Sequence, residues 1–168
     1  MRYATLALAL SLPGCGGSSP AAPTGPPPTT LPRMSAVTAS VSPSPLVAEP
    51  SANPGFMWAL RFSVTITETA GLACNVNLVN WTLRNATTGV ELNTLTWNPA
   101  EITARAGTNH VPARGSLTIP LAVVYTLSGG GRQGAGTVAA QVIDANGNTV
   151  NATATVSVVS RAVGPSLP

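Results

Sequence analysis

Residues 55–67 alternate strictly between apolar side chains and other side chains, and this pattern constrains the fold more than any other feature of the chain. The apolar members occupy every second position: Phe56, Trp58, Leu60, Phe62, Val64 and Ile66. Because successive side chains of a β-strand point to opposite faces, a period of two is typical of a strand with one buried face and one wet face. The pattern therefore predicts a central strand whose apolar residues face a core.

Six further segments have strand-like patterns, and no long segment has the period of a helix. We expect these strands over residues 35–42, 75–84, 90–97, 116–127, 137–144 and 150–158. Asn146-Gly147 predicts a tight hairpin between the last two. Residues 98–101 predict either one helical turn capped by Asn98 or a simple Asn-Pro turn. The prolines over residues 43–54 predict an irregular connection, and residues 107–115 predict a loop.

Seven short strands joined by turns rich in Gly, Pro and Asn indicate an all-β, two-sheet sandwich. The pattern over residues 34–162 resembles the immunoglobulin-like domains of bacterial surface and periplasmic proteins. This resemblance implies a seven-stranded antiparallel immunoglobulin-like β-sandwich, with a fibronectin III-like topology as the alternative. The Cys–Trp–Cys spacing of antibody domains is absent. Cys74 is therefore expected to be a small buried residue, unless it forms a disulfide with Cys15.

The first residues predict export from the cell. Residues 1–12 combine a basic start with a short apolar run, which is typical of a signal peptide. A membrane-spanning helix would take about twenty apolar residues. Leu12, Gly14 and Cys15 resemble the bacterial lipobox, in which the cysteine becomes lipidated, although Pro13 departs from the usual residue. The alternative is a plain secretory signal.

The lipobox resemblance implies a lipoprotein signal peptide over residues 1–14 and a lipid on Cys15. Residues 15–33 are rich in Pro, Gly, Ser, Thr and Ala, which have little to bury and favour an extended, disordered tether. Residues 34–162 are then the folded domain, and residues 163–168 a flexible tail. We expect an exported protein, anchored by its lipid in the cell envelope, either in the outer membrane or at the cell surface.

Composition narrows the possible functions. Charged residues make up 8% of the chain, against about 25% in a typical soluble protein, and lysine is absent. The eight arginines are scattered, whereas nucleic-acid binding requires clustered cations, so we expect no nucleic-acid partner. Residues 144–148 match the start of a calcium loop, but no acid stands at its closing position. With one histidine and five acids, we expect no enzyme activity, no catalytic residues, no metal and no cofactor.

Two classes of function remain. The first is a structural or interaction module that contacts an unknown envelope protein or glycan, and the second is a carbohydrate-binding module that uses an exposed aromatic ring. Trp97 is the best aromatic candidate, because its strand has mixed faces and ends at Asn98-Pro99, as an edge strand can. The alternative is that its ring closes the end of the core. The other candidate binding residues are arginines: Arg105, Arg114 and Arg132.

Lipidation of Cys15 can be measured directly. We expect the protein to incorporate labelled fatty acid and to partition into a detergent phase, because the acyl chains are buried there. Cys15→Ala removes the acceptor thiol and should abolish both properties. Equal labelling of the Cys15→Ala protein would show that the signal is an ordinary secretory one.

Overall fold

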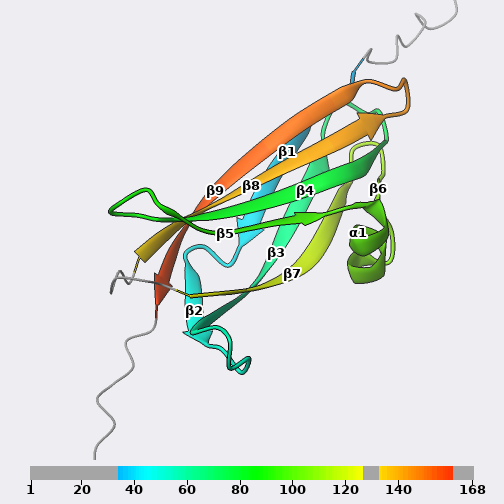
Figure 1. Ribbon diagram of the computed structural model, residues 1–168. Coiled ribbons are helices and arrows are strands. Elements are labelled where there is room, and N and C mark those ends of the chain that lie inside the picture. Colours follow the sequence, from blue (N-terminus) through cyan, green and yellow to red (C-terminus); the bar gives the residue numbers. More distant parts are fainter. Residues whose placement is uncertain (1–33, 127–132, 161–168) are drawn as a thin grey trace, which may run out of the picture. The chain divides into compact units, whose positions relative to one another are not determined.

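The strand expected around residues 55–67 is present as β3 (Trp58–Glu68), the middle strand of the first of two sheets (Figure 1). It pairs antiparallel with β1 (Val37–Ser42) on one side and with β7 (Ser116–Tyr125) on the other. The computed structural model describes residues 34–126 and 133–160, which belong to one compact unit. The expected signal peptide, lipidated cysteine, tether and tail lie outside the described residues.

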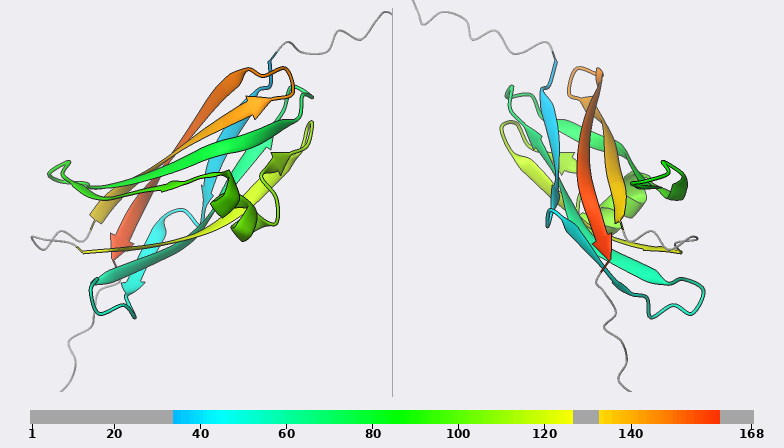
Figure 2. Two further views of the ribbon diagram at one scale, coloured as in Figure 1. Left: turned by 45° about the vertical axis from the view of Figure 1, so that its right-hand side comes forward. Right: turned by 90° about the vertical axis from the view of Figure 1, so that its left-hand side faces the viewer.

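The second sheet has the strand order β5-β4-β8-β9, and each neighbouring pair is antiparallel. Its strands are β4 (Cys74–Asn85), β5 (Glu91–Trp97), β8 (Gln133–Asp144) and β9 (Thr149–Ser160). The expected hairpin between β8 and β9 is present, with Gly147 at φ 83° in the left-handed region that glycine favours. The right-hand view in Figure 2 shows the two sheets as separate layers.

β2 (Leu46–Pro50) joins the two sheets and corrects the expectation of seven antiparallel strands. Its first three residues pair parallel with β9, and its last two pair antiparallel with β3. The irregular connection expected here is wrong because Leu46 and Ala48 alternate into the core, and their burial stabilises a short strand between prolines. The expected loop over residues 107–115 also contains β6 (His110–Val111), which pairs with the start of β4. The described residues therefore form nine strands in mixed pairing.

The inward faces of the two sheets share one hydrophobic core. Phe62 of β3 and Trp81 of β4 meet across the layers, with their ring centroids 4.7 Å apart. Trp81 is fully buried, and Gly136 of β8 makes room for it, since a Cβ there would lie 2.2 Å from the indole. Trp58 is half-buried at the start of β3. Four of the six expected core residues of this stretch are fully in the core: Leu60, Phe62, Val64 and Ile66.

Phe56 does not continue the strand, and its expected core position is wrong. Its side chain is 40% exposed, and that of the adjacent Met57 is 55% exposed. Two backbone hydrogen bonds close a loop here: the Ser51 N–H donates to the Met57 carbonyl at 3.1 Å, and the Phe56 N–H donates to the Asn53 carbonyl at 3.0 Å. These local bonds hold residues 51–57 in a turn, so the alternating sequence pattern extends beyond the strand itself.

The helical alternative at Asn98 is confirmed, and it extends to about two turns. α1 (Pro99–Ala106) begins with a capping box, in which the Glu101 N–H donates to Asn98 Oδ1 at 3.0 Å and the Asn98 N–H donates to Glu101 Oε2 at 2.9 Å. Gly107, at φ 80°, ends the helix. Ile102 is buried, and α1 contacts β4, β5 and β7, so it covers part of the side between the two sheets.

Two buried carboxylates fasten the start of β1 to neighbouring turns. Glu68 accepts four backbone N–H groups at 2.8–3.3 Å, from Ala36, Ala70, Gly71 and Arg114. Asp144 accepts three at 2.9–3.1 Å, from Ser35, Asn146 and Asn148. Burial by itself would raise the pKa of each carboxyl group, but the hydrogen bonds outweigh it and the pKa of both is lowered.

Glu68 should therefore make the folded state sensitive to acid. Because its pKa is lowered from 4.5, its contribution to stability is complete above about pH 4.5 and is lost as the pH falls through the folded value. In urea unfolding, we expect Glu68→Gln to be less stable than the parent at pH 7 and to lose less stability on acidification. Glu49→Gln, at an exposed carboxyl, is the control. The same acid dependence in Glu68→Gln and the parent would contradict this role.

Candidate anion-binding site

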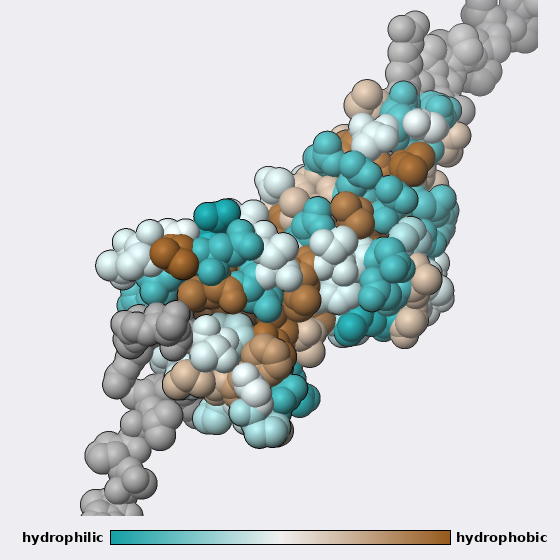
Figure 3. Space-filling model, in the orientation of Figure 1, coloured by the Kyte–Doolittle hydropathy of each residue, from teal (hydrophilic) through white to brown (hydrophobic). Residues whose placement is uncertain are grey.

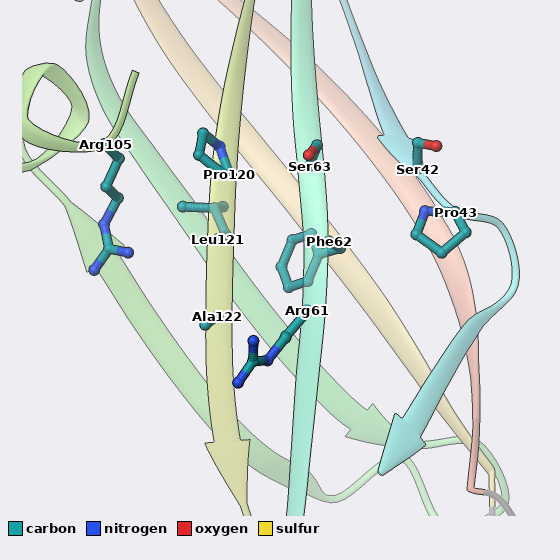
Figure 4. Close-up of a pocket in the computed structure, with 9 residues that line it drawn as sticks. All are labelled: Ser42, Pro43, Arg61, Phe62, Ser63, Arg105, Pro120, Leu121 and Ala122. Atoms are coloured by element: carbon teal, nitrogen blue, oxygen red, sulfur yellow. The ribbon is translucent and has the colours of Figure 1, made fainter. Parts of the chain in front are cut away.

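A depression of about 560 Å³ lies on the outer face of β3 and β7 (Figure 4). Arg61 and Ser63 of β3, Pro120 and Ala122 of β7, and the end of β1 contribute to its lining. Arg105, from the last turn of α1, completes it on the β7 side. We call this hollow the arginine depression.

Strand alternation explains why these side chains meet on one face. Phe62 points into the core, so its neighbours Arg61 and Ser63 point outward. The register between β3 and β7 sets Arg61 opposite Ala122 and Ser63 opposite Pro120. Small or compact residues therefore stand beside the long arginine side chain, and the surface above them stays open.

The arginine depression carries two guanidinium groups and no carboxylate. Among the described residues, the one ion pair joins Arg84 to Glu91 at 3.3 Å, so neither Arg61 nor Arg105 forms an ion pair with an acid. Glu49 lines a smaller neighbouring hollow together with Arg61, but the two form no ion pair. Guanidinium groups in this situation favour carboxylate or phosphate ligands, which they bind through paired hydrogen bonds.

Trp97 supports the site from below instead of facing solvent. Its side chain is 4% exposed, so it closes the core and offers no free ring for stacking on a sugar. The Arg105 guanidinium carbon lies 5.9 Å from the centre of the Trp97 ring, within the range of a cation–π contact. Of the two interpretations of Trp97, the one in which its ring closes the end of the core is confirmed, because α1 follows immediately and packs beside the end of β5.

Arg114, another arginine predicted as a binding residue, does not line the depression. Arg114 stands at φ 54°, donates its backbone N–H to Glu68 at 2.8 Å and extends its side chain beside Gly71. Arg132 lies outside the described residues. Arg61 was missed as a binding residue, although the alternation of its strand correctly predicts its outward direction. The sequence feature that could have identified Arg61 is a cation on the solvent-facing side of a central strand. Such a cation is notable in a chain with so few charges.

The Cys74 thiol is protonated at neutral pH. Cys74 is a free thiol with 2% exposure, and burial, reinforced by the nearby Glu68 and Asp144 charges, raises its pKa to about 11. The thiol therefore stays protonated, as expected of a small buried residue. Across residues 34–126 and 133–160, no group of three His, Cys, Asp or Glu residues could hold a metal ion. No helix in the same part of the chain is long and apolar enough to cross a membrane.

Exposed hydrophobic side chains are dispersed over the surface. On the face that Figure 3 shows, hydrophobic residues form small groups separated by polar ones. Phe56 is the one aromatic residue in the described part of the chain with more than a third of its surface exposed. With Met57 beside it, the loop over residues 51–57 is the second surface that could contact a ligand.

Comparison with known proteins identifies the fold and no family. No family model matches the sequence, and no curated protein matches it. The structural genomics target SoR45 has a TM-score of 0.56 and 12% identity, covering 79% of this chain and 92% of its own. A Bordetella pertussis protein described as ApaA has a TM-score of 0.54 and 13% identity, covering 77% and 97%. Murine CRIg has a TM-score of 0.40 and 18% identity, covering 75% and 98%.

Trp97→Ala tests whether the Trp97 ring beneath Arg105 is part of the hydrophobic core. Removing a large ring from the core should cost about 3–5 kcal/mol in the free energy of unfolding. Leu95→Ala, on the same strand but partly exposed, should cost much less. A Trp97→Ala protein whose denaturant midpoint matches that of Leu95→Ala would contradict the buried position.

Proposed function

We propose that this protein is a lipid-anchored, non-catalytic interaction module of the cell envelope. In this proposal, an immunoglobulin-like β-sandwich is held on a proline-rich tether and binds an acidic group of an envelope partner through Arg61 and Arg105. The anchor is supported by the lipobox-like sequence ending at Cys15 and by the composition of residues 15–33. Because a fold does not define a function, the binding step rests on the site alone.

The strand order supports an immunoglobulin-like topology. In such sandwiches, strands A, B and E lie in one sheet and strands C, F and G in the other, with C′ added beside C in variable-type domains. β1, β3 and β7 correspond to A, B and E, while β4, β5, β8 and β9 correspond to C, C′, F and G. β2 then corresponds to a part of strand A that has moved to the opposite sheet beside G.

The observation that carries the binding proposal is the pair of guanidinium groups without a carboxylate in one hollow. Like charges that share a depression repel each other, so a ligand anion between them relieves repulsion as well as forming hydrogen bonds. The contact of Arg105 with Trp97 holds one of these groups against a buried ring, which reduces the ordering cost of binding. The site is therefore partly organised before a ligand arrives.

A carbohydrate-binding module is the second candidate, supported by the exposure of Phe56. Its ring takes the role that the sequence assigned to Trp97, since it is available at the tip of a loop. Stacking on a sugar would use this ring and would not require the arginines. The two candidates therefore place the partner on different surfaces and respond to different substitutions.

Cosedimentation with bacterial cell-envelope fragments tests the proposal. The full-length chain carries Cys15→Ala, so that no lipid contributes to the binding. We expect Arg61→Gln combined with Arg105→Gln to weaken binding about tenfold or more, because each lost charge-assisted hydrogen bond is worth about 1.5–3 kcal/mol. Arg84→Gln is the matched control, since it removes an arginine that already pairs with Glu91.

The outcomes separate the candidates. Loss of binding in the double variant, with Arg84→Gln and Phe56→Ala unchanged, supports the arginine depression. Loss only in Phe56→Ala supports the second candidate, in which a sugar stacks on the Phe56 ring. Unchanged binding in the double variant would contradict the proposed function. A melting temperature that matches that of the parent verifies that any loss of binding is not caused by unfolding.

A further inference from the structure

The outer face of β1, β3 and β7 carries hydroxyl side chains in register next to the arginine depression. One row across the three strands consists of Ser40, Thr65 and Thr118. The next row consists of Thr38, Thr67 and Ser116. We call these two rows the hydroxyl array. The Thr65 and Thr118 hydroxyl oxygens lie 3.0 Å apart, so hydroxyls of neighbouring strands already interact within the first row.

The hydroxyl array continues directly into the depression. The following row places Ser42 opposite Ser63, and both line the hollow. Neighbouring strands are about 4.8 Å apart, and side chains two residues apart on one strand are about 6.6–6.8 Å apart, so the hydroxyls form a regular two-dimensional pattern. The array itself contains no charged and no large apolar side chain.

We infer that the ligand of this face is an acidic polysaccharide. A sugar-acid carboxylate would occupy the depression between Arg61 and Arg105, and the adjoining sugar rings would lie along the hydroxyl array. Serine and threonine hydroxyls both donate and accept hydrogen bonds, as sugar hydroxyls do, so the two surfaces are chemically complementary. This inference rests on the proposed function and specifies the class of partner.

An acidic peptide fits the same face less well. It would neutralise the arginines, but peptide interfaces take most of their energy from aromatic and arginine anchors in desolvated pockets. Phe62 and Leu121 line the depression, but their side chains are only 4% and 3% exposed, and the exposed Phe56 belongs to the loop over residues 51–57. A continuous array of hydroxyls would remain unused beneath a peptide that contacts only the depression.

The second sheet supplies an internal comparison. Its outer face has a row of four threonines across four strands: Thr94, Thr82, Thr137 and Thr155. The neighbouring arginine, Arg84, is neutralised by Glu91. This row has the hydroxyls without an open cationic site, so it should not hold an acidic polymer.

The test uses polygalacturonate, a linear uronic-acid polymer, and the full-length chain carrying Cys15→Ala. Binding is measured by titration calorimetry, with polyglutamate and a neutral glucan as comparison polymers. Thr65→Val with Thr118→Val keeps the β-branched shape and removes two hydroxyls from the array. The matched control is Thr82→Val with Thr137→Val on the other sheet, and thermal unfolding verifies that each variant is folded.

We expect polygalacturonate to bind more tightly than either comparison polymer. A hydrogen bond contributes about 0.5–1.5 kcal/mol, so Thr65→Val with Thr118→Val should weaken binding about fivefold or more, while the control pair should leave it unchanged. Arg61→Gln with Arg105→Gln should remove most of the binding and its dependence on salt.

Other results would overturn the inference. Binding that depends on the arginines but not on Thr65 and Thr118, or polyglutamate that binds as tightly as polygalacturonate, leaves the anion-binding proposal standing and rules out the polysaccharide. Absence of polygalacturonate binding also rules out the polysaccharide, and it leaves the anion-binding proposal standing when envelope binding still depends on the arginines. If Arg61→Gln with Arg105→Gln changes neither polygalacturonate binding nor envelope binding, the proposed function is overturned as well.

Discussion

The packing of Phe62 against Trp81 is the contact on which the rest of the domain depends. The two rings meet across the layers at 4.7 Å, and Trp81 fits because β8 has a glycine, Gly136, beneath it. With Phe62 held inward, the pleat of β3 sends Arg61 and Ser63 to the opposite face. The proposed binding surface is therefore the direct counterpart of the core, formed by the same strand.

The low content of charged residues determines the composition of this surface. Only 8% of the residues are charged, so the wet faces of both sheets consist mainly of threonine, serine, asparagine and small residues. On such a background, Arg61 and Arg105 stand out as two cations that line one hollow and form no ion pair. Buried acids are used differently: Glu68 and Asp144 each accept several backbone N–H groups and stabilise turns.

Alternation alone was enough to predict the long strands, because β3, β7, β8 and β9 each bury one face and expose the other. It failed where long-range pairing or local turns decide the structure. β2 is stable because it pairs with β9 and β3, which lie far from it in the sequence. Phe56 fits the strand pattern, but hydrogen bonds within its own loop hold it outside the sheet.

The candidate site was predictable only in part. The direction of Arg61 follows from the sequence, whereas its meeting with Arg105 depends on the register of β7 and on the position of α1. Trp97 remained ambiguous because β5 has mixed faces, and only the packing of α1 decides that its ring is buried. A sequence pattern predicts which face a residue occupies, but not which residues from distant elements come together on that face.

A crystal structure of the full-length chain with a uronic-acid oligosaccharide would test the central claim most directly. The account predicts sugar density across β3 and β7, with a carboxylate oxygen about 3 Å from a guanidinium nitrogen of Arg61 or Arg105. Sugar bound beside Phe56 or over the threonine row of the second sheet, with the arginine depression empty, would contradict it.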